Sequence, residues 1–206
     1  MEKESILKAL QELRKQEKRK FIQTAELIIN LRNFDVKKQS INLFVELPYK
    51  IKEKKVCAFL TKKSTLVDTI TKAEFDDYKG KKVKKLIKKY DFFISAASLM
   101  PAVATSFGKV LGPAGKMPSP QLGILMKEEN KAIEEVLEKV NKITRIKSKE
   151  PSLKISIGKE NMKDEEIAEN AIVIYNKVLD ALPRKKENLR SILIKFTMTK
   201  PQKINF

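Results

Sequence analysis

The sequence of 206 residues contains no histidine and a single cysteine, Cys57. Without histidine the chain lacks the side chain that most often serves as a general base or as a zinc ligand. One cysteine excludes an intrachain disulfide, and its apolar surroundings favour a buried, unreactive thiol in a reducing, cytoplasmic setting. We therefore expect no catalytic residues, no metal site and no cofactor.

The sequence also lacks an apolar run long enough to cross a membrane. Residues 92–108 carry no charge, but they include Pro101 and several hydroxyl side chains and fall short of the roughly 20 apolar residues that a spanning helix needs. The first residues open into a charged amphipathic pattern instead of an apolar signal segment. We therefore expect no membrane partner.

Basic residues are abundant: 44 lysines and arginines outnumber 26 acidic residues, and the formal net charge is +18. Such a surplus attracts polyanions through its long-range field and through counterion release, so nucleic acid is the first candidate partner. A solvated basic surface without a specific ligand is the alternative. The densest run, Lys79 to Lys89, predicts a basic amphipathic helix whose lysines either contact phosphates or only face solvent.

The pattern of apolar residues differs between the two ends of the chain and its middle. Both ends alternate apolar and polar residues, as strands with one exposed face do, whereas the middle contains continuous apolar runs typical of buried parallel strands. The helix that follows Pro151 has Asp164 as a plausible N-cap. At the two ends we expect helices at 3–18 and 164–182, and strands at 24–31, 41–47, 153–157 and 190–198.

These two patterns of apolar residues predict a mixed α/β protein of two domains. Residues 1–54 and 150–206 are expected to form a discontinuous, two-layer α+β domain. Residues 55–149 are expected to form an inserted, three-layer, Rossmann-like α/β domain. Charge alone does not distinguish which of the two binds nucleic acid, because both carry a net positive charge.

One glycine-rich segment carries a specific resemblance. Leu111-Gly-Pro-Ala-Gly-Lys116 does not have the glycine spacing of a phosphate loop, and Met117 stands where such a loop has a hydroxyl residue. Taken together with Met117 to Pro120, however, the segment closely resembles the L-G-P-x-G-x-M-P-x-P motif of the ribosomal protein L1 family. Similarities to the archaeal members of that family follow in chain order: Lys20-Phe-Ile-Gln-Thr24 with Glu26, Leu47-Pro48, Asp91-Phe-Phe-Ile94, Ser98-Leu-Met-Pro101, Ser191, and Thr197-Met198.

The resemblance implies a structural constituent of the large ribosomal subunit and not an enzyme. Such a protein binds large-subunit ribosomal RNA at the mobile stalk, assists release of deacylated tRNA from the exit site, and also represses translation of its own mRNA. It is expected to be cytoplasmic, in the large ribosomal subunit, and a monomer when free. The alternative is a general RNA-binding or RNA-modifying protein that acts off the ribosome.

The resemblance also places the main RNA surface on the split domain. The first contact cluster corresponds to Lys20, Phe21, Thr24 and Glu26, and the second to Ser191, Thr197 and Met198, with Thr199 standing where the family has glycine.

The residues themselves support a shared polar patch. Thr24 and Glu26 lie on the polar face of one predicted strand, and Ser191, Lys195 and Thr197 on that of another. If these strands are neighbours, hydroxyls and a carboxylate can bond ribose and base edges while lysines meet phosphates. The alternatives are that Phe21 only packs the first helix against the sheet and that Met198 belongs to the core.

Overall fold

The computed structural model describes residues 2–16, 19–36, 38–78, 80–120, 122–148 and 150–205. The protein is a mixed α/β protein with antiparallel and parallel sheets, which confirms the predicted fold class. It divides into two compact units: Met1–Lys52 together with Lys142–Phe206, and Glu53–Asn141. The sequence patterns predicted that the chain passes between the two domains near residues 54 and 150. In the structure the second boundary lies before residue 142, because a strand at 143–147 pairs with a strand of the first unit.

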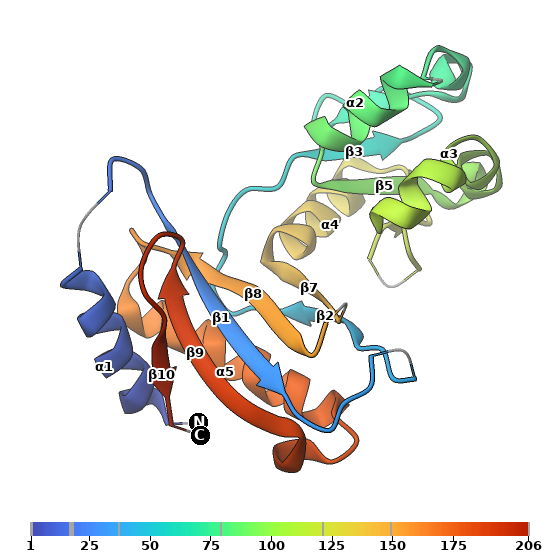
Figure 1. Ribbon diagram of the computed structural model, residues 1–206. Coiled ribbons are helices and arrows are strands. Elements are labelled where there is room, and N and C mark those ends of the chain that lie inside the picture. The colour runs from blue at the N-terminus through green and yellow to red at the C-terminus, as the bar shows by residue number, and fades with distance from the viewer. Residues whose placement is uncertain are drawn as a thin grey trace. The chain divides into compact units, whose positions relative to one another are not determined.

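The first unit is built on a four-stranded antiparallel sheet covered on one face by two helices (Figure 1). A separate two-stranded sheet completes this unit. In spatial order the large sheet contains β10 (Gln202–Ile204), β9 (Leu189–Phe196), β1 (Thr24–Leu31) and β8 (Ser152–Lys159); the helices are α1 (Lys3–Arg14) and α5 (Asp164–Ala181); the small sheet pairs β2 (Asn42–Glu46) with β7 (Ile143–Lys147).

Strict alternation in the sequence decides which side of the large sheet is covered. Along β1 every second side chain, from Ala25 to Leu31, is buried, and the residues between them are half-buried. The apolar residues of β8 and β9 are buried in the same cluster as those of α1 and α5. Because successive side chains on a strand point to opposite faces, the polar series of β1 lies on the face opposite the two helices.

The second unit contains a four-stranded parallel sheet with helices around it. The strand at Val56–Phe59 is buried along its whole length, as the continuous apolar run predicted, and Cys57 within it is a free, buried thiol. Four phenylalanine rings contact one another in the core, in both stacked and edge-to-face pairs: Phe59, Phe75, Phe93 and Phe107. The elements are β3 (Val56–Phe59), β4 (Asp68–Ile70), the 3-10 helix η1 (Lys72–Asp77), α2 (Lys81–Lys89), β5 (Phe92–Ala96), the 3-10 helix η2 (Ala97–Leu99), α3 (Met100–Ala114), β6 (Ile124–Leu125) and α4 (Asn130–Lys142).

The glycine-rich motif of this unit has a structural role. Helix α3 ends at Ala114, and Gly115 follows in the left-handed conformation with φ 69°, which glycine adopts without strain. The Lys116 ammonium donates to the carbonyl oxygens of Ile87 and Tyr90, both over 2.7 Å. This lysine therefore satisfies carbonyls at the C-terminal end of α2.

Several predicted boundaries need correction. Helix α1 ends at Arg14, earlier than predicted, and residues 17 and 18 lie outside the described residues. Asp164 is the first helical residue of α5, while Lys163 occupies the N-cap position with extended backbone. Strand β9 ends at Phe196, so Thr197 and Met198 lie in the turn to β10, a short strand that alternation did not reveal.

Candidate nucleic-acid interface

Strands β1 and β9, which come from opposite ends of the sequence, are direct neighbours in the sheet. Glu26 lies opposite Lys195 in their antiparallel register. At the end of the pair, the amide of Thr24 donates to the hydroxyl of Thr197 over 3.1 Å. The Thr24 hydroxyl in turn accepts a hydrogen bond from the Lys159 ammonium, over 2.9 Å. The structure therefore gathers these five residues in one patch.

Glu26 and Lys195 hold unused polar groups in this patch. Both side chains are half-buried. Within the ranges that the structure describes, neither the carboxylate nor the ammonium makes a hydrogen bond or an ion pair. A half-buried carboxylate without a donor is costly unless a ligand or water supplies one, so Glu26 is available to accept hydrogen bonds from a bound molecule.

The turn after β9 presents Met198 to solvent. Thr199 closes this turn: its amide donates to the Phe196 carbonyl over 3.2 Å, and its hydroxyl accepts from the Phe196 amide over 2.8 Å. The Met198 amide donates to the Gln23 side chain over 3.0 Å, while the Met198 side chain is 59% exposed. Met198 is therefore not a core residue, and the Thr199 side chain is directed back into the turn.

The segment before β1 presents a second apolar group. Phe21 is 52% exposed and Ile22 is 59% exposed, so Phe21 does not pack the first helix against the sheet. Gln23 next to them is buried, and its carbonyl accepts from the Glu160 amide over 2.9 Å. A hollow of about 420 Å³ opens beside this segment, lined by Arg14, Arg19, Lys20, Phe21, Ile22, Glu160 and Asn161.

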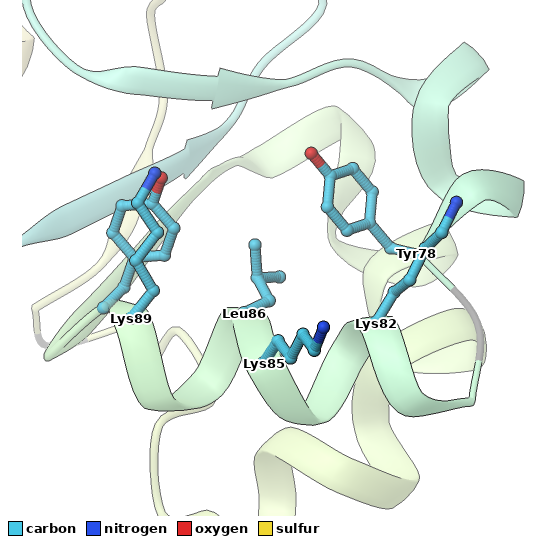
Figure 2. Close-up of a pocket in the computed structure, with 6 residues that line it drawn as sticks. Tyr78, Lys82, Lys85, Leu86 and Lys89 are labelled. Carbon is cyan, nitrogen blue, oxygen red and sulfur yellow. The ribbon is translucent and has the colours of Figure 1, made fainter.

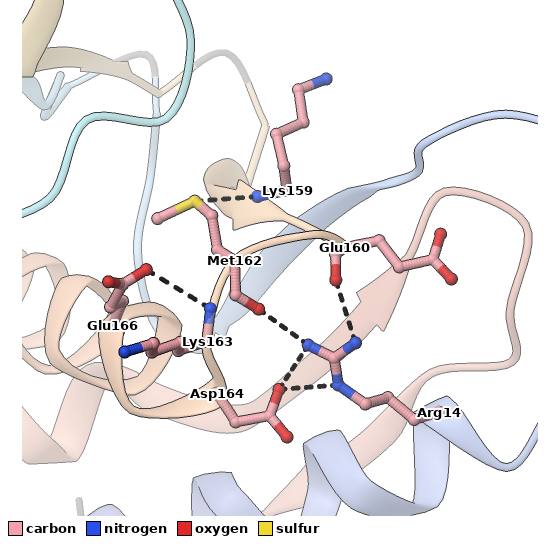
Figure 3. A network of polar contacts seen from close by, with 7 residues as sticks. All are labelled: Arg14, Lys159, Glu160, Met162, Lys163, Asp164 and Glu166. Carbon is pink, nitrogen blue, oxygen red and sulfur yellow. Dashed lines mark hydrogen bonds and ion pairs between the residues drawn. The ribbon is translucent and has the colours of Figure 1, made fainter.

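Arg14 anchors the chain around this hollow (Figure 3). Its guanidinium donates to the Asp164 carboxylate over 2.8 Å and to the carbonyl oxygens of Glu160 and Met162, both over 2.9 Å. At the same turn the Lys163 amide donates to the Glu166 carboxylate over 3.3 Å. The guanidinium thus ties the end of α1 to the turn between β8 and α5, which fixes one wall of the hollow.

Ser191 lies apart from this patch. It lies near the start of β9, six residues before Thr197 in the turn that follows the strand, which corresponds to roughly 20 Å of extended chain. Asn30 donates to its hydroxyl over 2.9 Å and accepts from the Ser152 hydroxyl over 2.8 Å. Ser191 therefore belongs to a polar ladder across three strands at the other end of the sheet.

Strand β8 contributes residues that the sequence analysis did not name as candidates. Lys159 contacts Thr24 directly, and Ser156 lies opposite Glu26 in the register. Lys154 is exposed on the same strand. The alternation of apolar residues from Leu153 to Ile157 placed Lys154 and Ser156 on a polar face. No pattern in the sequence indicated, however, that β8 is a neighbour of β1 in the sheet.

Other kinds of site find no support in the part of the chain that is described. No cluster of three or more carboxylate and thiol side chains there could hold a metal ion. No helix among the described residues is long and apolar enough to span a bilayer.

Comparison with known proteins identifies the family. The sequence profile of the Ribosomal protein L1p/L10e family matches residues 13–200. The large ribosomal subunit protein uL1 of Pyrobaculum calidifontis is 36% identical over 217 residues, which cover 99% of this chain and 95% of the relative. Those of Thermococcus kodakarensis and Nanoarchaeum equitans are each 33% identical, covering 96% and 90% of this chain and 95% and 92% of the relative.

These relatives are named as ribosomal proteins and not as enzymes, which confirms the prediction of a non-catalytic role. Their archaeal origin agrees with the archaeal type that the motifs indicated. From the matched profile and the relatives that span nearly its whole length, the chain belongs to the ribosomal protein L1p/L10e family.

Proposed function

We propose that this protein is a structural constituent of the large ribosomal subunit, in the cytoplasm, and binds large-subunit ribosomal RNA through the polar face of β1 and β9. The observation that carries the proposal is the patch in which Thr24 and Thr197 are hydrogen-bonded beside Glu26 and Lys195, whose charged groups have no partner among the described residues. Family membership supports the ribosomal role.

The patch offers each kind of contact that folded RNA requires. The Glu26 carboxylate accepts hydrogen bonds from ribose hydroxyls or base amino groups, whereas a lysine patch alone would recognise only charge. Lys20 and Lys195 meet phosphates. The exposed Phe21 and Met198 side chains supply apolar surface for unstacked bases at the rim.

The finer roles expected of the family rest on the same face. We infer that the protein, a monomer when free, stands at the mobile stalk and assists release of deacylated tRNA from the exit site. Repression of its own mRNA needs an RNA segment that imitates the ribosomal site. One face cannot hold both RNAs at once, so the mRNA segment and the ribosomal junction must compete.

A titration tests the proposed recognition. A stalk-junction RNA and a scrambled duplex of equal length are compared at 50 to 300 mM salt, conditions in which nonspecific phosphate binding weakens steeply (about 10³-fold or more between 50 and 200 mM). We expect the preference for the junction to survive. Equal affinity for both RNAs would reject specific recognition.

Two further measurements test the ribosomal placement. The protein should co-sediment with large subunits, and crosslinks from the β1–β9 face should map to ribosomal RNA of the stalk. Crosslinks to the leader of its own mRNA, displaced by the junction RNA, would support repression. Failure to co-sediment, together with binding to unrelated RNAs, would place the protein off the ribosome.

A further inference from the structure

Helix α2 in the second unit is basic on all of its exposed surface. It carries six lysines in nine residues and no acid, and only Val83 and Leu86 are buried. Lys82, Lys85 and Lys89 follow at intervals of three and four, so they lie along one face together with Leu86. Figure 2 shows these side chains arising from the helix, with Tyr78 beside Lys82 near one end, Lys89 near the other end, and Leu86 between the two. Lys79, the first lysine of the predicted run, lies outside the described residues.

The space between them is a hollow of about 350 Å³, lined by Tyr78, Lys82, Lys85, Leu86, Lys89 and Tyr90. Leu86 and Tyr90, both almost fully buried, form apolar surface inside, whereas the lysines are exposed around it. A volume near the lower end of the range for ligand sites, about 300 to 1,000 Å³, leaves room for one small planar group.

One wall of the hollow is fixed in place. The Tyr90 hydroxyl donates to the Asp68 carboxylate, and the Lys89 ammonium donates to the same oxygen over 3.3 Å. The Lys89 ammonium also lies 4.7 Å from the centroid of the Tyr90 ring, a cation–π contact. These interactions hold Lys89 at one end, so little of its conformational freedom remains to be lost on binding.

The other wall has unused groups. Within the described residues, the ammonium groups of Lys82 and Lys85 have no acidic partner, and the Tyr78 hydroxyl makes no hydrogen bond. Tyr78 is half-buried and directs its hydroxyl into the open space (Figure 2). The hollow thus combines an apolar interior, one free hydroxyl and two unpaired cations.

We propose that this hollow binds an unpaired nucleotide of single-stranded RNA, with the base over Leu86 between Tyr78 and Lys89 and the flanking phosphates on Lys82 and Lys85. A base attached to phosphates matches an apolar recess bordered by cations, and base stacking on aromatic rings tolerates any sequence. The Tyr78 hydroxyl can bond a base edge or a ribose hydroxyl. The contact goes beyond the ribosomal role proposed above, because it lies in the other unit and uses none of the β1–β9 residues.

Charge complementarity favours a nucleic acid over the other anionic partners. A stretch of acidic peptide would satisfy the lysines, but its carboxylates carry no planar body for the recess. A free mononucleotide fits the recess but engages few of the six lysines, whereas a strand with a phosphate at each residue can follow the helix. The two alternatives are therefore separate outcomes of the test.

Matched variants of the full chain test the proposal. The pair Lys82→Gln/Lys85→Gln lines the hollow, and the control pair Lys81→Gln/Lys84→Gln removes the same charge at the same spacing outside it. Binding of a labelled uridine heptamer is followed by fluorescence anisotropy. We expect the pocket pair to weaken binding about tenfold more than the control pair, and Tyr78→Phe to weaken it less than Tyr78→Ala. Crosslinking to 4-thiouridine in the heptamer should label the peptide that contains Tyr78.

Each other outcome overturns the proposal. Equal losses for the two lysine pairs would show a charge effect without a pocket. Competition by a glutamate heptamer at the same concentration as RNA would identify an acidic peptide as the ligand. Binding of AMP or UMP as tight as that of the heptamer would identify a mononucleotide site. These results leave the β1–β9 proposal untouched, because both lysine pairs preserve that face, and the crosslink on wild-type protein does not depend on how well Tyr78→Ala folds.

Discussion

Thr24 and Thr197, which are 173 positions apart in the sequence, are joined by a hydrogen bond of 3.1 Å from the amide of one to the hydroxyl of the other. The same hydroxyl lies 3.4 Å from the Thr24 carbonyl oxygen and donates to it. It therefore continues the β1–β9 hydrogen-bond ladder beyond the last residue of β9. The pair is a structural closure of the sheet as well as part of the candidate surface.

Replacing Thr197 by valine should lower both stability and RNA affinity. The change keeps the shape of the side chain but leaves the Thr24 amide without its acceptor, so the free energy of unfolding should fall by about 1 to 3 kcal/mol. Affinity for a junction RNA should fall by a similar amount, on the order of 1 to 3 kcal/mol. Urea unfolding and anisotropy titration measure the two effects. Thr197→Ser retains the hydroxyl and serves as the control; a loss of affinity as large as that of valine would contradict a role for the hydroxyl.

Replacing Phe21 by alanine should separate binding from folding. Because the ring is 52% exposed, the free energy of unfolding should change by no more than about 0.5 kcal/mol. Loss of a stacking contact should weaken binding of the junction RNA by about 1 to 3 kcal/mol. Met126→Ala is the matched control, since Met126 is 88% exposed in the other unit. If Phe21→Ala binds the junction RNA like wild type, the contact surface does not include this segment.

Replacing Arg14 by glutamine should destabilise the first unit. The change removes hydrogen-bond donors to the Asp164 carboxylate and to the carbonyls of Glu160 and Met162. A hydrogen bond from a charged group contributes about 1.5 to 3 kcal/mol to stability. We expect a loss of about 2 to 3 kcal/mol in urea unfolding. Lys15→Gln breaks only an exposed ion pair with Glu12 and should change stability by less than about 1 kcal/mol. Similar losses for both variants would refute the anchoring role.

Replacing Lys116 by methionine should destabilise the C-terminal end of helix α2. The methionine keeps the apolar stem but leaves the Ile87 and Tyr90 carbonyls without a donor. The free energy of unfolding of the second unit should therefore fall by about 1 to 3 kcal/mol. Hydrogen exchange should accelerate in the last turn of α2. Lys109→Met changes an exposed lysine of α3 and should exchange like wild type. Unchanged protection in the Lys116 variant would show that the cap is dispensable.

Cys57 should resist thiol reagents in the folded protein. Burial raises the pKa of its thiol to about 12 from an ordinary value of 9.0, so at pH 9 the unfolded chain is half thiolate while the folded chain stays protonated. The unfolded state therefore binds fewer protons, and stability should fall as pH rises from 9 towards 12. Labelling with a disulfide reagent at pH 9 should be slow in buffer and fast in denaturant. Rapid labelling without denaturant would mean that the thiol is accessible.

Local patterns predicted the first unit well where one face of an element is buried. Strand β1 was predicted at 24–31 and lies at Thr24–Leu31, because a strand with one covered face must alternate. The inward residues of β8, such as Ile155, followed for the same reason. Strand β10 was missed, since three residues after Pro201 are too few to show a period.

Relations between distant elements could not be predicted in the same way. The polar face of each strand was readable, but the order that puts β1 between β8 and β9 depends on how the whole sheet assembles. Ser191 was grouped with Thr197 because the expected strand at 190–198 put both on one polar face, but Ser191 lies near the start of β9 and Thr197 lies in the turn after its last residue. The contact of Lys159 with Thr24 depends on a register shift beside Ala25, which leaves no local signal.

Strand β1 is made early in synthesis, but both of its neighbours, β8 and β9, begin only at Ser152 and Leu189. At about 5 to 20 residues per second, a nascent chain therefore holds β1 unpaired for on the order of ten seconds, while the contiguous unit Glu53–Asn141 emerges and can fold first. A product of interrupted translation that stops before β9 lacks one side of the β1–β9 pair. Such fragments cannot assemble the complete β1–β9 face, so under the proposed function recognition of RNA through this face requires a chain that has been synthesised beyond β9.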